Sequence, residues 1–358
     1  MGPERRRELL RFMRSDGVIR VLVVDDSRLV RELIRAILES EPGIVVAGEA
    51  ANGMEACAMV ASLHPDIVTM DIEMPVMGGL EAIEKIMTEH PVPILVVTAL
   101  TGVRTAFAAI SKGALDVIEK PDVSAENMRP LIHKIRYLAK VDVVAHLTSV
   151  RHHGKAAGAL PGAPRRGIAG PGIVAIAAST GGPQAIYSVL AQLPATFRLP
   201  IVITQHIAEG FTQGMADWLG SGTPLTVELA ADGARLAPGH VYVNPAEHSM
   251  RVTAQGTIVL GDRELKQVYN PSCNTLLSSV ASAYRKGAVG LIMSGMGDDG
   301  VSGMKDIRDA GGTTLAQDAK SSVIFGMNRL AVERGYIARV VPLAGIPAEL
   351  LKCAGGGT

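Results

Sequence analysis

Apolar runs alternate with segments of helical periodicity along the first 140 residues. The apolar run 18–24 precedes a segment, 29–38, in which apolar residues recur at helical spacing. Further strands are predicted over 44–47, 66–70, 94–97 and 114–118, and further helices over 53–62, 80–89, 102–112 and 125–139. Five such βα units predict a doubly wound parallel sheet, whose functional residues gather at the carboxyl ends of its strands.

A second α/β pattern begins near residue 172 and continues to about residue 352. The apolar run 173–178 ends at Ser179, and two glycines and a helix-patterned segment follow. Further strands are predicted over 200–204 and 288–294. This pattern predicts a second, Rossmann-like, doubly wound domain.

The pattern is lost between these two segments, where glycine, alanine and proline predominate. We expect residues 141–171 to form a flexible linker that joins a first domain over 18–140 to a second over 172–352. Residues 1–17 are expected to be an N-terminal extension.

Charge, cysteine content and hydropathy limit the classes of function that this protein can have. Lysine plus arginine and aspartate plus glutamate each total 35, so no overall charge points to nucleic acid. The three cysteines form neither a disulfide framework nor a zinc-binding spacing, which favours a reducing cytoplasm. No apolar run approaches the roughly 20 residues that span a bilayer. We therefore expect a soluble, cytoplasmic protein without membrane insertion.

Acidic and polar residues occupy the carboxyl ends of four strands predicted in the first domain. They are Asp25, Asp26, Asp71, Thr98 and Lys120. Any one aspartate could simply cap the next helix, but together these groups indicate a site. Carboxylates favour Mg²⁺, and a cation beside an ammonium group stabilises a phosphoryl group in transfer.

Residues 18–140 resemble a two-component response-regulator receiver. The matching motifs are V-V-D-D-S (23–27), D-I-E-M-P-V-M-G-G (71–79), V-T-A (97–99) and E-K-P (119–121). The resemblance implies that Asp71 accepts a phosphoryl group from a histidine kinase. The implied Mg²⁺ ligands are Asp25, Asp26, Asp71 and the backbone carbonyl of Glu73. Thr98 and Lys120 are the implied contacts of the phosphoryl group.

Three strand ends of the second domain carry Ser179, His206 and a pair of adjacent carboxylates. Ser179 alone is a good helix N-cap, and His206 alone could be a structural histidine. The segment 295–300, G-M-G-D-D-G, also matches the dinucleotide fingerprint G-x-G-x-x-G. Its two aspartates, Asp298 and Asp299, would repel a pyrophosphate, so we favour a Ser–His–Asp site for acyl transfer.

The second domain resembles the catalytic domain of the chemotaxis protein-glutamate methylesterases, the CheB family. The matching motifs are A-S-T-G-G (178–182), Q-H (205–206), G-F-T (210–212), S-G-M-G-D-D-G (294–300), A-Q-D (316–318) and F-G-M (325–327). The resemblance implies that Ser179 is the nucleophile, His206 the base and Asp299 the residue that orients it. It places the backbone N–H of Met296 in the oxyanion hole.

The family resemblance also implies a reaction and its partners. The expected activity is hydrolysis of glutamate γ-methyl esters on chemoreceptors, with deamidation of receptor glutamine as a side activity and no cofactor at the esterase site. The sequence departs from the family pattern at Ala177, at 207–209 (Ile-Ala-Glu), at Asn274 and at Asn328. None of these departures removes a triad residue.

Two other functions remain open. The second domain could be a non-catalytic output module that binds a protein partner, with Ser179 only capping a helix. It could instead bind a nucleotide through 295–300. DNA binding has little support, because no basic recognition helix follows the first domain.

Overall fold

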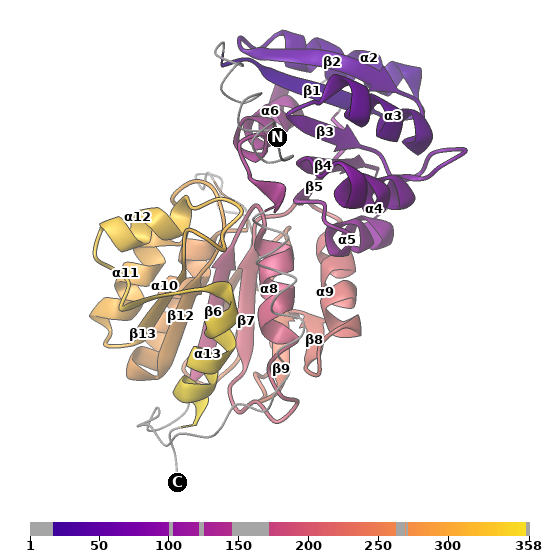
Figure 1. Ribbon diagram of the computed structural model, residues 1–358. Coiled ribbons are helices and arrows are strands. Elements are labelled where there is room, and N and C mark those ends of the chain that lie inside the picture. Colours follow the sequence, from indigo (N-terminus) through magenta and orange to yellow (C-terminus); the bar gives the residue numbers. More distant parts are fainter. Residues whose placement is uncertain are drawn as a thin grey trace.

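The computed structural model describes residues 17–99, 103–121, 125–144, 172–262, 269 and 271–355. These residues form two α/β units, each built around its own sheet (Figure 1). The expected N-terminal extension and most of the expected linker, residues 1–16 and 145–171, lie outside the described residues. Of the linker segment, 141–144 is described, and its Val143 is buried.

The first unit is a five-stranded parallel sheet in the order β2-β1-β3-β4-β5, which confirms the predicted doubly wound fold. Its strands are β1 (Ile19–Val24), β2 (Ile44–Ala50), β3 (Ile67–Met70), β4 (Ile94–Thr98) and β5 (Asp116–Glu119). The helices that alternate with them are α2 (Arg28–Glu39), α3 (Gly53–Leu63), α4 (Gly79–Glu89), α5 (Val103–Ser111) and α6 (Ala125–Leu138).

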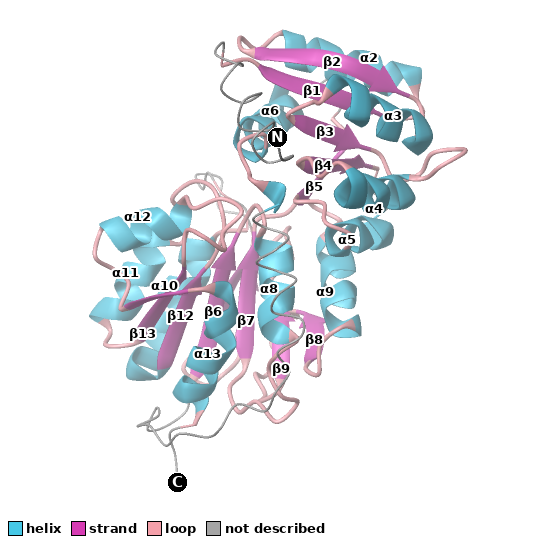
Figure 2. Cartoon of the chain, viewed as in Figure 1, coloured by secondary structure: helices cyan, strands magenta, loops and turns pink. Residues whose placement is uncertain are grey.

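The helices of this unit lie on both faces of its sheet (Figure 2). Helix α2 contacts α6, whereas α3, α4 and α5 contact one another in sequence. The apolar β3 and β4 are buried along their whole length because helices cover both faces of the sheet. Side-chain caps define two helix starts: Ser27 accepts a hydrogen bond from the N–H of Val30, and Asn52 accepts one from Glu55.

The second unit is a seven-stranded parallel sheet in the order β14-β13-β12-β6-β7-β9-β8. Its strands are β6 (Ile173–Ala178), β7 (Ile201–Gln205), β8 (Thr226–Leu229), β9 (His240–Val243), β12 (Ala288–Ile292), β13 (Thr313–Gln317) and β14 (Arg339–Val341). Its helices are α8 (Gly182–Leu190), α9 (Thr212–Ser221), α10 (Cys273–Tyr284), α11 (Val301–Asp309), α12 (Met327–Glu333) and α13 (Ile346–Ala354). The predicted Rossmann-like fold is confirmed.

The sequence pattern did not predict four strands of this sheet, β8, β9, β13 and β14, and the unit differs from it in two further ways. An antiparallel hairpin of β10 (Ser249–Val252) and β11 (Ile258–Gly261) lies outside the parallel sheet. Strand β12 ends at Ile292, two residues before the predicted end; the N–H of Ser294 bonds to the side-chain oxygen of Gln317 (2.9 Å) instead of to the backbone of a neighbouring strand. The central strands β12, β6 and β7 end side by side and position the site described next.

Among the described residues, no helix combines the length and the apolar composition that crossing a bilayer requires. The three cysteines are all free thiols; Cys57 is half-buried, and Cys273 and Cys353 are buried.

Candidate active site

Ser179 lies in the turn that joins β6 to α8. Every residue of β6 is buried, and Ser179 follows the strand with only 8% of its surface exposed. Gly181 has a φ of +76°, a left-handed conformation that favours glycine. At Gly182 a Cβ atom would lie 2.1 Å from the side-chain oxygen of Gln205. The two glycines therefore let the chain turn sharply and leave the serine at the carboxyl edge of the sheet.

His206 is brought beside Ser179 by the pairing of β6 with β7. Ala178 is in register with Gln205, and the N–H of His206 donates to the carbonyl of Ala178 (3.0 Å). The buried amide of Gln205 donates to the carbonyls of Ser179 (2.8 Å) and His206 (2.9 Å). Gln205 therefore fixes the two backbone segments against each other, a role that the strand-end pattern does not reveal.

Asp299 holds the imidazole of His206 from the other side. Its Oδ2 lies 2.8 Å from Nε2 of His206, and the carboxylate is 2% exposed. Three further donors surround it: the backbone N–H groups of Cys273 (2.6 Å) and Asn274 (2.9 Å), and the hydroxyl of Ser272 (3.1 Å). The start of α10 therefore fixes the position of the carboxylate, a contact that the sequence pattern does not predict.

The environment of Asp299 keeps it ionised. Burial raises its pKa, but the hydrogen bond and charge of His206 and the N–H groups of α10 outweigh burial, so the pKa of Asp299 lies below its usual value. Neighbouring Asp298 is exposed. The structure therefore separates the two adjacent aspartates: the buried one contacts the histidine, and the other faces solvent.

Because Nε2 of His206 bonds to Asp299, Nδ1 is the ring nitrogen that can accept the proton of Ser179. Within the described residues, no hydrogen bond yet joins the Ser179 hydroxyl to His206; such bonds are often long before substrate binds. The ring of Tyr269 stacks on the imidazole, with centroids 5.2 Å apart and planes 5° from parallel. Tyr269 and Asp299 together restrict how the imidazole can rotate.

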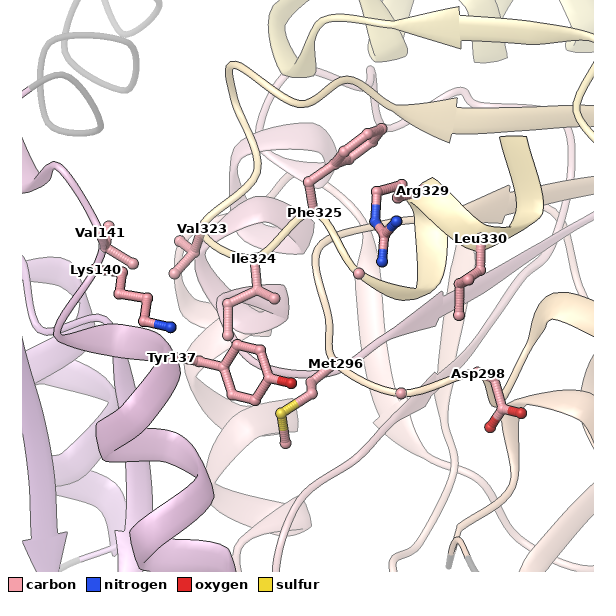
Figure 3. Close-up of a pocket in the computed structure, with 12 residues that line it drawn as sticks. Tyr137, Lys140, Val141, Met296, Asp298, Val323, Ile324, Phe325, Arg329 and Leu330 are labelled. Atoms are coloured by element: carbon pink, nitrogen blue, oxygen red, sulfur yellow. The ribbon is translucent and has the colours of Figure 1, made fainter. Parts of the chain in front are cut away.

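Met296 lies in the loop that follows β12, against the serine. At Gly295, the preceding residue, a Cβ atom would lie 2.7 Å from Cβ of Ser179, so only glycine allows this approach. Met296 also lines a cavity of about 590 Å³ between the two units. In Figure 3 its side chain lies near Tyr137, which comes from the end of α6. Met296 thus directly follows a residue packed on Ser179; its role as an oxyanion-hole donor stays a prediction.

The loop 295–300 does not form a phosphate cradle. Asp299 is committed to His206 and to the start of α10, and Asp298 adds a second negative charge. The side-chain oxygen of Asn274 accepts hydrogen bonds from the N–H groups of Gly300 (2.9 Å) and Gly303 (2.9 Å) at the start of α11. These contacts remove the donors that a nucleotide phosphate would need.

The departures from the family pattern fit the structure. Asn274 caps α11 as a neutral amide and so places no second carboxylate beside Asp299. Ala177 is fully buried in β6. Asn328 is fully buried and donates to the carbonyl of Gln317 (3.0 Å). In the segment 207–209, the first two residues are half-buried and the glutamate is exposed.

The acidic residues of the first unit also come together. A carboxylate oxygen from each of Asp25, Asp26 and Asp71 lies within 4.8 Å of the others. Lys120 Nζ lies 2.7 Å from Oδ2 of Asp25 and 2.8 Å from Oδ2 of Asp71. Burial raises the pKa of Asp25, and the charge of Asp71 adds to that effect. Burial lowers the pKa of Lys120, but its contacts with the two aspartates raise it above the usual value overall.

This oxygen-only donor set fits Mg²⁺, because a hard cation would relieve the crowding of carboxylates. Asp25, Asp26 and Asp71 would hold it. Thr98 is buried at the end of β4, and Glu73 is exposed in the loop after β3; its backbone carbonyl stays a predicted ligand. The structure therefore gathers the predicted phosphorylation residues at one end of the sheet.

Comparisons with known proteins match both units. The family model for the CheB methylesterase matches residues 174–350, and that for the response regulator receiver domain matches residues 21–133. A protein-glutamate methylesterase/protein-glutamine glutaminase from Paramagnetospirillum magneticum is 49% identical, over 96% of this chain and 98% of its own. One from Anaeromyxobacter dehalogenans is 44% identical, over 94% of this chain and 97% of its own.

A solved structure resembles the second unit. The crystal structure of the Thermotoga maritima CheB methylesterase catalytic domain is 35% identical, with a TM-score of 0.50. The match covers 51% of this chain and 99% of that one. Both domain matches, and the near-complete coverage of the relatives, show that this chain belongs to the family of CheB protein-glutamate methylesterases with a receiver domain.

Proposed function

We propose that the protein hydrolyses glutamate γ-methyl esters on chemoreceptors and deamidates receptor glutamine, under the control of its receiver. The observation that carries this proposal is the contact of half-buried His206 with buried Asp299, 2.8 Å apart, beside Ser179 at the carboxyl edge of the sheet. A histidine oriented by an ionised carboxylate is the arrangement that activates a serine nucleophile.

The chemistry follows from the positions of these groups. Nδ1 of His206 accepts the Ser179 proton as the serine oxygen attacks the ester carbonyl, and the backbone N–H of Met296 stabilises the oxyanion. The histidine returns the proton to the leaving oxygen, and methanol departs. Water, deprotonated by the same nitrogen, then cleaves the acyl-enzyme to free glutamate and Ser179. With a glutamine side chain, ammonia leaves instead of methanol.

The receiver is docked close to this site. Lys134 of α6 forms an ion pair with Asp116 of the receiver and donates to Oγ1 of Thr180 (3.3 Å), the residue after Ser179. At a second contact, Nε1 of Trp218 in α9 donates to the hydroxyl of Ser111 in α5 (3.0 Å). We propose that this docked state restricts access of a receptor to Ser179.

Aromatic packing supports the second contact. The ring of Trp218 stacks with Phe107 of the receiver (5.6 Å between centroids) and with Tyr187 of α8 (4.8 Å). Phe107 is fully buried. We propose that phosphorylation of Asp71 shifts the receiver to a state that binds this surface less well. Mg²⁺ at the acidic site would neutralise the phosphoryl oxygens, and Thr98 and Lys120 would contact them.

The partners follow from the two domains. A histidine kinase would supply the phosphoryl group, and methylated receptor cytoplasmic domains would be the substrate. We place the enzyme in the cytoplasm, with domain boundaries at 18–140 and 172–352.

A serine-reactive phosphonate distinguishes this function from a binding module. We expect the phosphonate to modify Ser179 of the full chain, because the adjacent histidine activates that hydroxyl. Peptide mass mapping locates the adduct, and His206→Gln should slow its formation strongly. If Ser179 stays unmodified while the phosphonate reacts with a known serine esterase, Ser179 is not an activated nucleophile and the second domain is a binding module.

Substitution of the adjacent aspartates tests which one orients the histidine. Asp299→Asn should lower kcat by roughly 10²- to 10⁴-fold, because an amide cannot stabilise the imidazolium that forms. Asp298→Asn, at an exposed position, should stay within about threefold of the wild type. Both variants are compared in an ester hydrolysis assay, with circular dichroism as a check on folding. Equal losses of kcat in the two variants would contradict the assignment of Asp299 as the residue that orients His206.

A further inference from the structure

The chemistry proposed above makes no use of the thiol of Cys273. This side chain is fully buried at the first residue of α10, and its Sγ lies 3.5 Å from Nε2 of His206. The sulfur also lies 3.6 Å from the carbonyl oxygen of Thr204. A sulfur atom therefore contacts the same imidazole nitrogen that Asp299 holds.

Cys273, His206 and Asp299 form a convergent set of metal ligands. One ligand atom from each residue lies within 4.8 Å of the others. Thiolate sulfur, imidazole nitrogen and carboxylate oxygen are the three donors that zinc binds in proteins. The only other such group within the described parts of the chain is the receiver's Asp25, Asp26 and Asp71, which offers oxygen alone.

The spacing of the donors suits a tetrahedral ion. Ordinary zinc bond lengths place a sulfur and a nitrogen ligand about 3.5 Å apart, which matches the Cys273–His206 separation of 3.5 Å. A nitrogen and an oxygen ligand should be about 3.4 Å apart, so Oδ2 of Asp299 would retreat by about 0.6 Å from its present 2.8 Å. Water or the Ser179 hydroxyl would supply the fourth ligand.

We propose that Cys273, His206 and Asp299 form a zinc site whose occupation switches the esterase off. This inference rests on the proposed function. Zinc on Nε2 would leave the only proton of a neutral imidazole on Nδ1, the nitrogen that must accept the proton of Ser179. The thiol would lose its proton to solvent on binding. The metal would thus coordinate both the histidine that acts as the base and the carboxylate that orients it.

Cobalt binding tests the site without any assay of activity. Co²⁺ is added to the full chain in excess Mg²⁺, which saturates the oxygen-only receiver site. We expect a thiolate-to-cobalt charge-transfer band with tetrahedral visible bands. Cys273→Ser and Cys273→Ala should both lose the charge-transfer band, whereas Cys353→Ser, which changes the other buried cysteine, should keep it. Absence of the band in the wild type, or its persistence in both Cys273 variants, overturns the proposal.

Zinc titration of ester hydrolysis then tests the consequence. Each variant is compared with its own rate in chelator, so changes in basal rate cancel. Zinc should inhibit the wild type reversibly, and the Cys273 variants should need at least about tenfold more zinc. Equal inhibition of wild type and Cys273→Ala overturns the proposal. Failure of the proposed function would show separately, as no Ser179-dependent hydrolysis in chelator.

Discussion

Ser179→Ala should abolish methanol release from methylated receptors, with kcat falling by at least about 10³-fold. The hydroxyl is the group that His206 and Asp299 are placed to activate, and an alanine at the end of buried β6 leaves the packing intact. The measurement is the initial rate of methanol release by the full chain after phosphorylation.

Ser188→Ala is the matched control for this substitution. Ser188 lies on α8, the helix that follows Ser179, and its hydroxyl only bonds to the carbonyl of Gln184 (2.9 Å). Its loss should leave the rate near that of the wild type. A Ser179→Ala enzyme that keeps near-normal turnover would show that another group is the nucleophile.

A fragment that begins at Gly172 should hydrolyse esters faster than the unphosphorylated full chain. The receiver contacts Thr180 through Lys134 and packs its Phe107 on Trp218, so its removal opens the surface beside Ser179. Coupling between sites usually amounts to 1–3 kcal/mol, which corresponds to an increase of about 5- to 150-fold. The fragment retains the complete seven-stranded sheet.

The comparison is made with receptor substrate, at equal concentrations of both proteins. Asp71→Asn in the full chain provides the second arm, because it keeps the receiver but removes the phosphoacceptor. It should stay at the slow rate when a phosphodonor is added. If the fragment is no faster than the unphosphorylated full chain, the receiver does not block the site and must activate it by other means.

The fold was largely predictable because parallel strands buried on both faces leave a clear pattern. Strand-end position placed Ser179, His206 and a pair of aspartates at one edge of the second sheet, and the pairing of β6 with β7 and β12 brings these strand ends together. The same reasoning predicted that Asp25, Asp71 and Lys120 lie together at the carboxyl edge of the first sheet.

Contacts between distant segments were not predictable. The backbone N–H groups that bond to the Asp299 carboxylate come from the start of α10, 25 or 26 residues earlier in the chain. No local sequence pattern predicts this contact. Gln205 bridges two carbonyls only because the sheet register places it there. The contact of Lys134 with Thr180 depends on how two separately folded units dock. Such contacts follow from tertiary geometry rather than from periodicity.

The choice between Asp298 and Asp299 shows the same limit. The sequence alone offers two identical side chains in adjacent positions, and the family resemblance selected the second. In the structure only Asp299 is buried and bonded to the histidine, because the turn of the loop points neighbouring side chains in different directions.

The central claim is that a serine esterase acts on methylated receptors under the control of Asp71. Its most direct test is the initial rate of methanol release from methylated chemoreceptor membranes by the full chain, in Mg²⁺, before and after a small phosphodonor is added. Slow release that accelerates with the phosphodonor in the wild type, but not in Asp71→Asn, is the predicted result. Absence of methanol from the phosphorylated wild type, or equal rates with and without the phosphodonor, would contradict the account.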